Sequence, residues 1–75
     1  MVKVYSTNSC PWCVKAKNYL ASLNVEYVDL NVQDDMEARE EMVSKSKQMG
    51  VPVLDINGSI IVGFDRNAID SALNK

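Results

Sequence analysis

The chain contains two cysteines, Cys10 and Cys13, separated by Pro11 and Trp12. A C-x-x-C pair has three chemical uses: it can carry thiol–disulfide exchange, supply half of a metal site, or form a structural disulfide. A tetrahedral zinc site needs four ligands, and two thiols without any histidine cannot complete one within the chain. A disulfide that closes so short a loop adds little stability, so we expect redox chemistry.

The position of the pair in the chain also favours a redox role. Pro11 suits the first turn of a helix, which makes Cys10 the N-cap. Because a helix N-terminus stabilises an anion, we expect a lowered pKa for the Cys10 thiol and a nucleophilic thiolate. Cys13 lies one turn further along and is expected to be deeper, as the resolving thiol. Trp12 is expected at the rim, where it either covers the sulfur, contacts a bound peptide, or has no specific role.

The chain has no histidine, and the charged side chains near the cysteine pair are all lysines. Cysteine-protease catalysis has no support, because the chain offers no histidine as general base. Residues 1–25 contain three lysines and no acidic residue. Lys15 and Lys17 would then either stabilise a thiolate or attract an anionic partner, unless both are only solvated surface groups.

The first half of the chain predicts two parallel strands joined by a helix. Residues 2–5 and 25–32 alternate apolar and polar positions, as strands do. The helix between them begins at Pro11, and such a crossover makes the strands parallel. Its apolar stripe is predicted to comprise Val14, Lys17, Leu20, Ala21 and Leu23.

The second half predicts a helix, a hairpin and a final helix. Asp34 with Glu37 resembles a capping box, and the helix that follows should end near Met49 and Gly50. Asn57-Gly58 between two apolar runs, 51–56 and 59–63, is a strong hairpin signal. Asp65 is expected to cap the last helix. The predicted buried positions are Met36, Ala38, Met42 and Val43 in the earlier helix and Ala68, Ile69, Ala72 and Leu73 in the last one.

The resulting order, β-α-β-α-β-β-α, predicts an α/β fold in which three helices flank a four-stranded mixed sheet. We expect a single domain over residues 1–75 and a monomer. The net charge of −2, without blocks of like charge, favours neither nucleic acid nor a membrane as partner. With no signal peptide or transmembrane segment recognisable, we expect a cytoplasmic protein, in which a dithiol cycles between states.

The whole chain resembles the glutaredoxins of the thioredoxin-fold superfamily, especially the small bacterial glutaredoxin-like redoxins. Three stretches carry the resemblance. Residues 10–13 resemble the C-P-[YFW]-C active site, and Gly50-Val51-Pro52 stands where the family has T-V-P. Residues 62–66 resemble its G-G-x-D-D segment. The resemblance implies a thioredoxin-like fold and a glutathione-dependent thiol–disulfide oxidoreductase.

The resemblance also implies a glutathione site. The Val51–Pro52 peptide is expected to be cis, so that the Val51 backbone pairs with the cysteinyl part of glutathione like an added strand. Phe64 and Asp65 would bind the γ-glutamyl end, and Gly63 would permit its close approach. Pro52, Gly63 and Asp65 also have plain structural interpretations as a strand start, a hairpin end and a helix cap.

Several positions depart from the family pattern. Thr7 stands where many members have a lysine, Gly50 replaces the threonine of T-V-P, and Arg66 replaces the second aspartate of D-D. Arg66 would either bind the glutathione carboxylate or change the choice of partner. Lys47 and Gln48 are further candidates for the carboxylate at the glycine end.

Four functions are compatible with these residues. The first is reduction of protein disulfides or glutathione mixed disulfides by a Cys10 thiolate, with Cys13 or glutathione as the resolving thiol and no resident metal. The second is a redoxin reduced by thioredoxin reductase that donates electrons to enzymes such as ribonucleotide reductase. The third is a carrier in which two chains and two glutathiones hold an iron–sulfur cluster through Cys10 thiolates. The last is an interaction module with idle cysteines.

Overall fold

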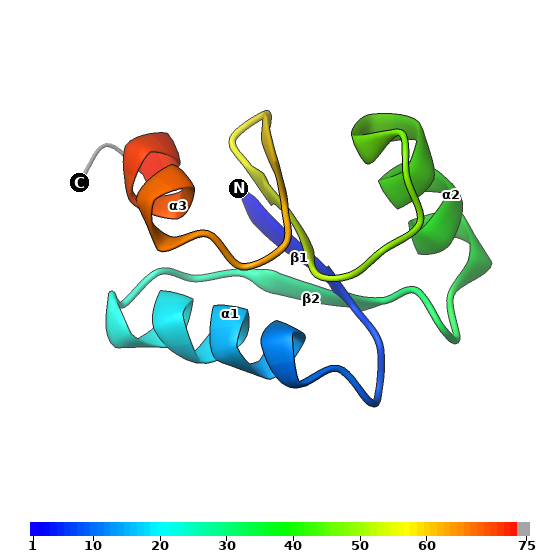
Figure 1. Cartoon of the computed structure of the whole chain (residues 1–75), viewed down its shortest axis with the longest axis horizontal. Helices are drawn as coiled ribbons and strands as arrows, with labels where there is room; N and C mark the ends of the chain where they lie inside the picture. The colour runs from blue at the N-terminus through cyan, green and yellow to red at the C-terminus, as the bar shows by residue number, and fades with distance from the viewer. Residues whose placement is uncertain (74–75) are drawn as a thin grey trace.

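The computed structural model describes residues 1–73, which form four strands and three helices in the predicted order (Figure 1). The first four elements are β1 (Val2–Ser6), α1 (Pro11–Ser22), β2 (Val28–Asn31) and α2 (Met36–Ser46). They are followed by β3 (Val53–Ile56), β4 (Ser59–Val62) and α3 (Arg66–Leu73). Within residues 1–73, no helix is long and apolar enough to cross a membrane.

The strands form one mixed sheet in the order β2-β1-β3-β4. Strands β1 and β2 are parallel, whereas β3 is antiparallel to both β1 and β4. The β3–β4 turn places Asn57 at φ 52° and Gly58 at φ 99°, the left-handed conformations that an Asn-Gly hairpin turn requires. The predicted parallel pair and hairpin are therefore confirmed.

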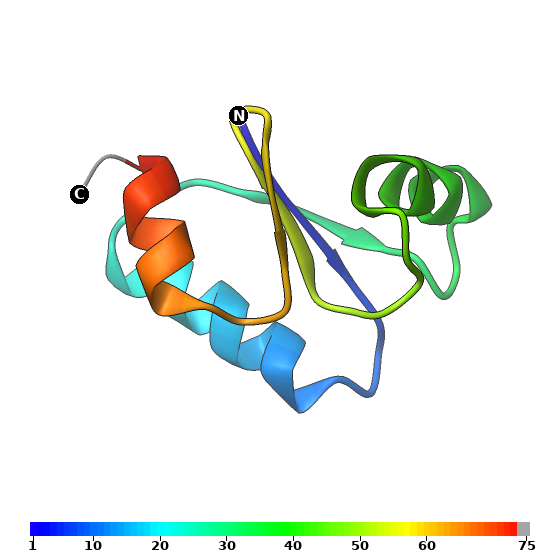
Figure 2. The same cartoon turned by 45° about the horizontal axis from the view of Figure 1, so that its top comes forward.

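Helices α1 and α3 cover one face of the sheet and α2 covers the other, as the two views show (Figures 1 and 2). Strand β1 contributes side chains to the cores on both faces of the sheet, because successive side chains of a strand point to opposite faces. Val4 packs with Leu20 of α1 and Ile69 of α3, whereas Tyr5 packs with Met42 of α2. The helices thus form two separate cores on the two sides of the sheet.

The buried stripe of α1 differs from the prediction. Val14 is 51% exposed, and the fully buried residues are Cys13, Ala16 and Leu20. These three follow helical spacing that begins at the second cysteine, so the cysteine is itself a core residue of the helix. The prediction is confirmed at Leu20 and wrong at Val14, and it left out Cys13 and Ala16.

The start of α2 also differs from the prediction. Its N-cap is Asp35 rather than Asp34, because Asp35 Oδ1 accepts a hydrogen bond from the Ala38 amide at 3.2 Å. The preceding turn is fixed by Asn31, whose side-chain oxygen accepts from the Asp34 amide. Met36 is consequently 62% exposed, whereas Ala38 and Met42 are buried as expected.

The end of α2 falls earlier than Met49 and Gly50. The helix ends at Ser46, and Lys47 adopts the left-handed conformation at φ 62° that closes it. The strands β2 and β3 are likewise shorter than the predicted 25–32 and 51–56. Pro52 lies outside β3, consistent with its lack of an N–H for the ladder.

A polar cluster fastens α2 to the sheet. Lys45 donates hydrogen bonds to Glu41 at 2.9 Å and to Asp55 of β3 at 2.5 Å. Glu41 also accepts from Lys3 and from the buried Tyr5 hydroxyl of β1. These hydrogen bonds lower the pKa of Glu41 to about 2, and the bond from Lys45 contributes most. For Asp55, burial alone would raise the pKa, but the hydrogen bonds from Lys45 and from the Gly58 amide, together with the nearby positive charges, lower the pKa overall.

We expect the Glu41 cluster to make stability acid-sensitive. A carboxylate whose pKa is lower in the folded protein than in the unfolded chain stabilises the fold. For Glu41 this stabilisation is complete at pH values above the ordinary pKa of 4.5, and it is lost as the pH falls towards about 2. Glu41→Gln should therefore cost about 1 kcal/mol at pH 7, with solvent screening allowed for, and show a smaller loss of stability between pH 5 and pH 2. Urea unfolding at several pH values measures both effects.

The matched control is Glu40→Gln, which removes an exposed carboxylate from the same helix. It should follow the wild-type pH dependence. An unchanged pH dependence for Glu41→Gln would show that the cluster does not couple α2 to the sheet.

Candidate active site around Cys10 and Cys13

Cys10 occupies the N-cap of α1, as predicted. Its backbone is extended, at φ −122° and ψ 100°, and its Sγ accepts a hydrogen bond from the Cys13 amide at 3.1 Å. Pro11 is the first helical residue, where its missing N–H leaves no unsatisfied donor. The Cys10 sulfur therefore lies where helix amides and the helix dipole favour negative charge.

The two cysteines have different environments. They are joined by a disulfide, with their Cα atoms 5.2 Å apart. Cys13 is completely buried, whereas Cys10 is partly exposed. An incoming disulfide can therefore reach Cys10 but not Cys13, which supports Cys10 as the attacking sulfur and Cys13 as the internal one.

The Val51–Pro52 peptide is cis, as the family resemblance implies. The Pro52 carbonyl accepts a hydrogen bond from the Gly63 amide at 2.8 Å, which ties this peptide to the end of β4. Gly63 has φ 83°, a conformation that other residues adopt only with strain. A cleft of about 280 Å³ is lined by Trp12, Val51, Pro52, Gly63 and Phe64.

Trp12 forms one wall of this cleft. Its side chain is 55% exposed, and its ring centre lies 6.4 Å from that of Phe64. Lys15, one turn along α1, holds its ammonium 4.2 Å from the Trp12 ring centre. The indole is thus placed to contact whatever enters the cleft, and it lies beside a positive charge.

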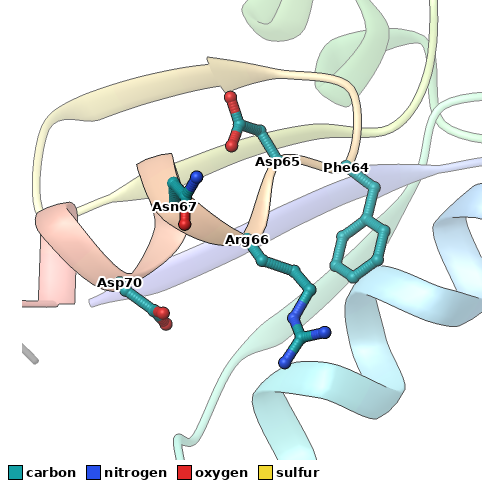
Figure 3. Close-up of a pocket in the computed structure, with 5 residues that line it drawn as sticks. All are labelled: Phe64, Asp65, Arg66, Asn67 and Asp70. Atoms are coloured by element: carbon teal, nitrogen blue, oxygen red, sulfur yellow. The ribbon is translucent and has the colours of Figure 1, made fainter.

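Asp65 caps α3 through a hydrogen bond from the Ala68 amide to its carboxylate, at 3.1 Å. A hollow of about 540 Å³ opens at this helix N-terminus, lined by Phe64, Asp65, Arg66, Asn67 and Asp70. Figure 3 shows that Asp65 and Arg66 extend in opposite directions, with Arg66 directed towards α1. There its guanidinium lies 4.9 Å from the ring centre of Tyr19.

A third hollow, of about 350 Å³, surrounds Thr7 at the end of β1. It brings together Thr7, Val32, Gln33, Arg39, Met42, Met49 and Val51. Arg39 and Gln33 were not predicted from the sequence. Arg39 supplies a positive charge near the position where the family pattern has a lysine and this chain has Thr7. Only the packing of α2 against the end of β1 reveals this proximity.

Lys47 and Gln48 are not among the residues that line these hollows. The Gln48 side chain instead accepts a hydrogen bond from the Gly50 amide at 2.6 Å and donates one to the Gly50 carbonyl at 3.0 Å. Lys47 closes α2. Both residues therefore shape the loop that leads to Pro52.

The three hollows are linked in a row by shared lining residues, and we call this row the run of hollows. The Thr7 hollow and the cleft share Val51, and the cleft and the α3 hollow share Phe64. The run has Arg39 near one end and Arg66 near the other, with the cleft beside Trp12 in the middle. No group of three or more His, Cys, Asp or Glu side chains in residues 1–73 is arranged to hold a metal ion.

Comparison with known proteins agrees with this geometry. The Glutaredoxin family model matches residues 2–61. An uncharacterized glutaredoxin-like 8.6 kDa protein in the rubredoxin operon of Clostridium pasteurianum is 59% identical over 75 residues, which is 100% of both chains. Glutaredoxin 3 of Escherichia coli is 34% identical over 64 residues, 85% of this chain and 77% of the relative.

Solved structures show the same fold. The glutaredoxin of Methanosarcina mazei superposes with a TM-score of 0.85 at 30% identity. The superposition covers 99% of this chain and 78% of the other.

We expect Gly63 to be required for the shape of the cleft. Gly63→Ala meets no neighbour within 4 Å, so its effect is conformational and should cost about 1 kcal/mol or more. It should also slow the reaction of reduced Cys10 with a small disulfide, because the Gly63 amide holds the Pro52 carbonyl. Thermal unfolding and stopped-flow thiol exchange measure the two effects.

Gly58→Ala is the matched control. Gly58 has a similar φ of 99° and equally open surroundings, but it lies at the opposite end of β4. It should lose similar stability and keep the reaction rate. Equal slowing in both variants would refute a local role for Gly63.

Proposed function

Because this chain belongs to the glutaredoxin family, whose members are thiol–disulfide oxidoreductases, we propose that it reduces protein disulfides or glutathione mixed disulfides with glutathione as electron donor. One observation carries the proposal. A partly exposed Cys10 caps the N-terminus of α1, and Cys13, one turn further along, is completely buried. Trp12, which lies between the two cysteines in the sequence, lines the cleft together with the cis Val51–Pro52 peptide. This arrangement separates an accessible attacking thiol from a protected resolving one.

The reaction begins with the reduced protein. The Cys10 thiolate attacks one sulfur of the substrate disulfide and forms a mixed disulfide with it, and the other sulfur leaves as a thiolate that takes a proton. Cys13 then loses its proton and attacks Cys10 Sγ. This forms the Cys10–Cys13 disulfide and releases the second substrate thiol, so two electrons have passed from the protein to the substrate.

For a glutathione mixed disulfide, a glutathione thiol can replace Cys13 in the second step. It attacks the glutathione sulfur bound to Cys10, which releases oxidised glutathione and restores the Cys10 thiolate. This one-thiol route needs a bound glutathione whose sulfur faces Cys10.

The run of hollows supports glutathione as the ligand. Glutathione has a carboxylate at each end and a cysteine between them, and the run has the same order of features. The Val51 backbone beside Cys10 would pair with the cysteinyl part. Arg39 near Thr7 would bind the glycine carboxylate, and the start of α3 at Phe64 and Asp65 would bind the γ-glutamyl carboxylate, with Arg66 in the same hollow.

A second candidate reductant is thioredoxin reductase. Two features of the chain favour it over glutathione. Thr7 carries no charge at the position of the family lysine, and the Gln48 amide is bound to Gly50 rather than free for a ligand. Both features reduce the number of contacts available to glutathione. The chemistry at Cys10 and Cys13 would be the same with either reductant.

Turnover of a glutathionylated peptide distinguishes the two reductants. The purified protein is supplied with glutathione, glutathione reductase and NADPH in one assay, and with thioredoxin reductase and NADPH in the other. We expect NADPH consumption in the first assay. Turnover in the second assay alone would refute the glutathione proposal while preserving the roles of the cysteines.

Single-cysteine variants test those roles. Cys10→Ser should abolish reduction of every disulfide substrate, because the accessible nucleophile is lost. Cys13→Ser should lose the reduction of protein disulfides but still deglutathionylate a peptide, since that reaction needs one enzyme thiol. Both activities are followed by NADPH oxidation, and equal loss of both in the two variants would contradict the assignment.

A further inference from the structure

Two positive side chains beside the cleft are held over aromatic rings. The Lys15 ammonium lies 4.2 Å from the ring centre of Trp12, and the Arg66 guanidinium lies 4.9 Å from that of Tyr19. A cation over the face of an aromatic ring is attracted by the ring quadrupole. Stacking therefore favours these positions of the two cations before any partner arrives.

Phe64 connects the two pairs. Its ring centre lies 6.4 Å from Trp12 and 5.9 Å from Tyr19, the latter in an edge-on arrangement. Lys15, Trp12, Phe64, Tyr19 and Arg66 thus form a continuous surface, which we call the cation–aromatic ridge. Figure 3 shows Phe64 and Arg66 extending side by side towards α1. Because Trp12 and Phe64 also line the cleft, the ridge borders the place where a substrate disulfide meets Cys10.

The charges on the ridge are available to a partner. Among the ion pairs within residues 1–73, Lys17 pairs with Asp29, but neither Lys15 nor Arg66 takes part in one. The neighbouring acids of α3 have other contacts. Asp65 caps the helix, and Asp70 accepts a hydrogen bond from the Tyr19 hydroxyl at 2.5 Å.

The α1 side of the ridge, which carries Lys15, differs in charge from the rest of the protein, whereas Arg66 shares its hollow with Asp65 and Asp70. The whole chain has a net charge of −2, whereas residues 1–25 contain no acidic side chain. Positive side chains that take part in no ion pair attract a carboxylate that approaches a nearby reactive cysteine and repel an ammonium group.

We propose that the cation–aromatic ridge selects polypeptide substrates whose reactive cysteine is flanked by acidic residues, with Lys15 and Arg66 pairing with their carboxylates while the substrate disulfide reaches Cys10. The inference rests on the proposed oxidoreductase function and names its partner class. A polypeptide fits because the cleft and the α3 hollow share Phe64, so an extended chain bound at the cleft continues past Arg66. Tryptophan and arginine are also the side chains that most often dominate binding at protein interfaces.

The test uses three peptides that differ only in the residues flanking one cysteine, which are Glu, Gln or Lys. Each peptide is supplied as a mixed disulfide with a small uncharged thiol, and the pre-reduced protein reacts in a single turnover, so the result does not depend on the physiological reductant. We expect the Glu peptide to react about five-fold faster than the Gln peptide, and the Lys peptide to be slowest. This preference should shrink when the salt concentration rises from 0.05 M to 0.5 M.

Variants locate the effect on the ridge. The double variant Lys15→Gln with Arg66→Gln should reduce the preference for Glu over Gln to less than about two-fold. Arg66→Glu should favour the Lys peptide over the Glu peptide, which a merely structural role for Arg66 would not produce. The matched control is Lys17→Gln, which removes a charge from the same helix that is already paired with Asp29 at 2.9 Å, and it should keep the preference.

Each contrary outcome has a distinct meaning. Equal rates for the three peptides would overturn the inference and leave the oxidoreductase function intact. A preference that survives in the double variant would also overturn it, because the selecting charges would lie elsewhere. Failure to react with any of the peptides would overturn the proposed function itself.

Discussion

The antiparallel pairing of β1 with β3 is the constraint on which the active site depends. Strand β1 leads into the cysteine loop, and β3 follows directly after Pro52. Because Tyr5 pairs with Val53 in the register of the sheet, the end of β1 and the start of β3 lie side by side. That register brings the loop that leads to α1 close to the cis Val51–Pro52 peptide, although Val51 lies 38 positions after Cys13 in the sequence. A slip of one residue would turn Tyr5 to the opposite core and disconnect the two halves of the site.

The features predicted correctly from the sequence are those with local causes. Cys10 as the N-cap follows from Pro11 alone, and the hairpin follows from Asn57-Gly58. The features that were missed depend on contacts between distant segments. The helix α1 buries Cys13 rather than Val14 because its orientation is set by the core beneath it, and a cysteine is not counted in an aliphatic pattern. Arg39 reaches the Thr7 hollow only through the packing of α2, which no local signal reports.

The departure from the family pattern at Gly50 is physically linked to the neighbouring Gln48. Gly50 stands where glutaredoxins have a threonine, and a Cβ at this position would lie 2.7 Å from Gln48 Oε1, too close for the side chain to remain as it is. The Gln48 side chain fills that space and binds both polar groups of the Gly50 backbone. The loop before Pro52 is therefore held by a glutamine–glycine pair in place of the family threonine. A threonine introduced at this position would displace Gln48, so the two residues have to be considered together.

The same helix, α1, serves two different purposes on its exposed side. Its first turn favours the thiolate of Cys10 through backbone amides, which act equally on every substrate. Its exposed side also presents Lys15, which lies over the Trp12 ring, and Tyr19, over which the Arg66 guanidinium lies. The amides determine whether the sulfur reacts, whereas the stacked cations act on the surroundings of the disulfide that approaches it. Because the two sets of groups are separate, partner choice can change through Lys15 and Arg66 without any change in the chemistry at Cys10 and Cys13.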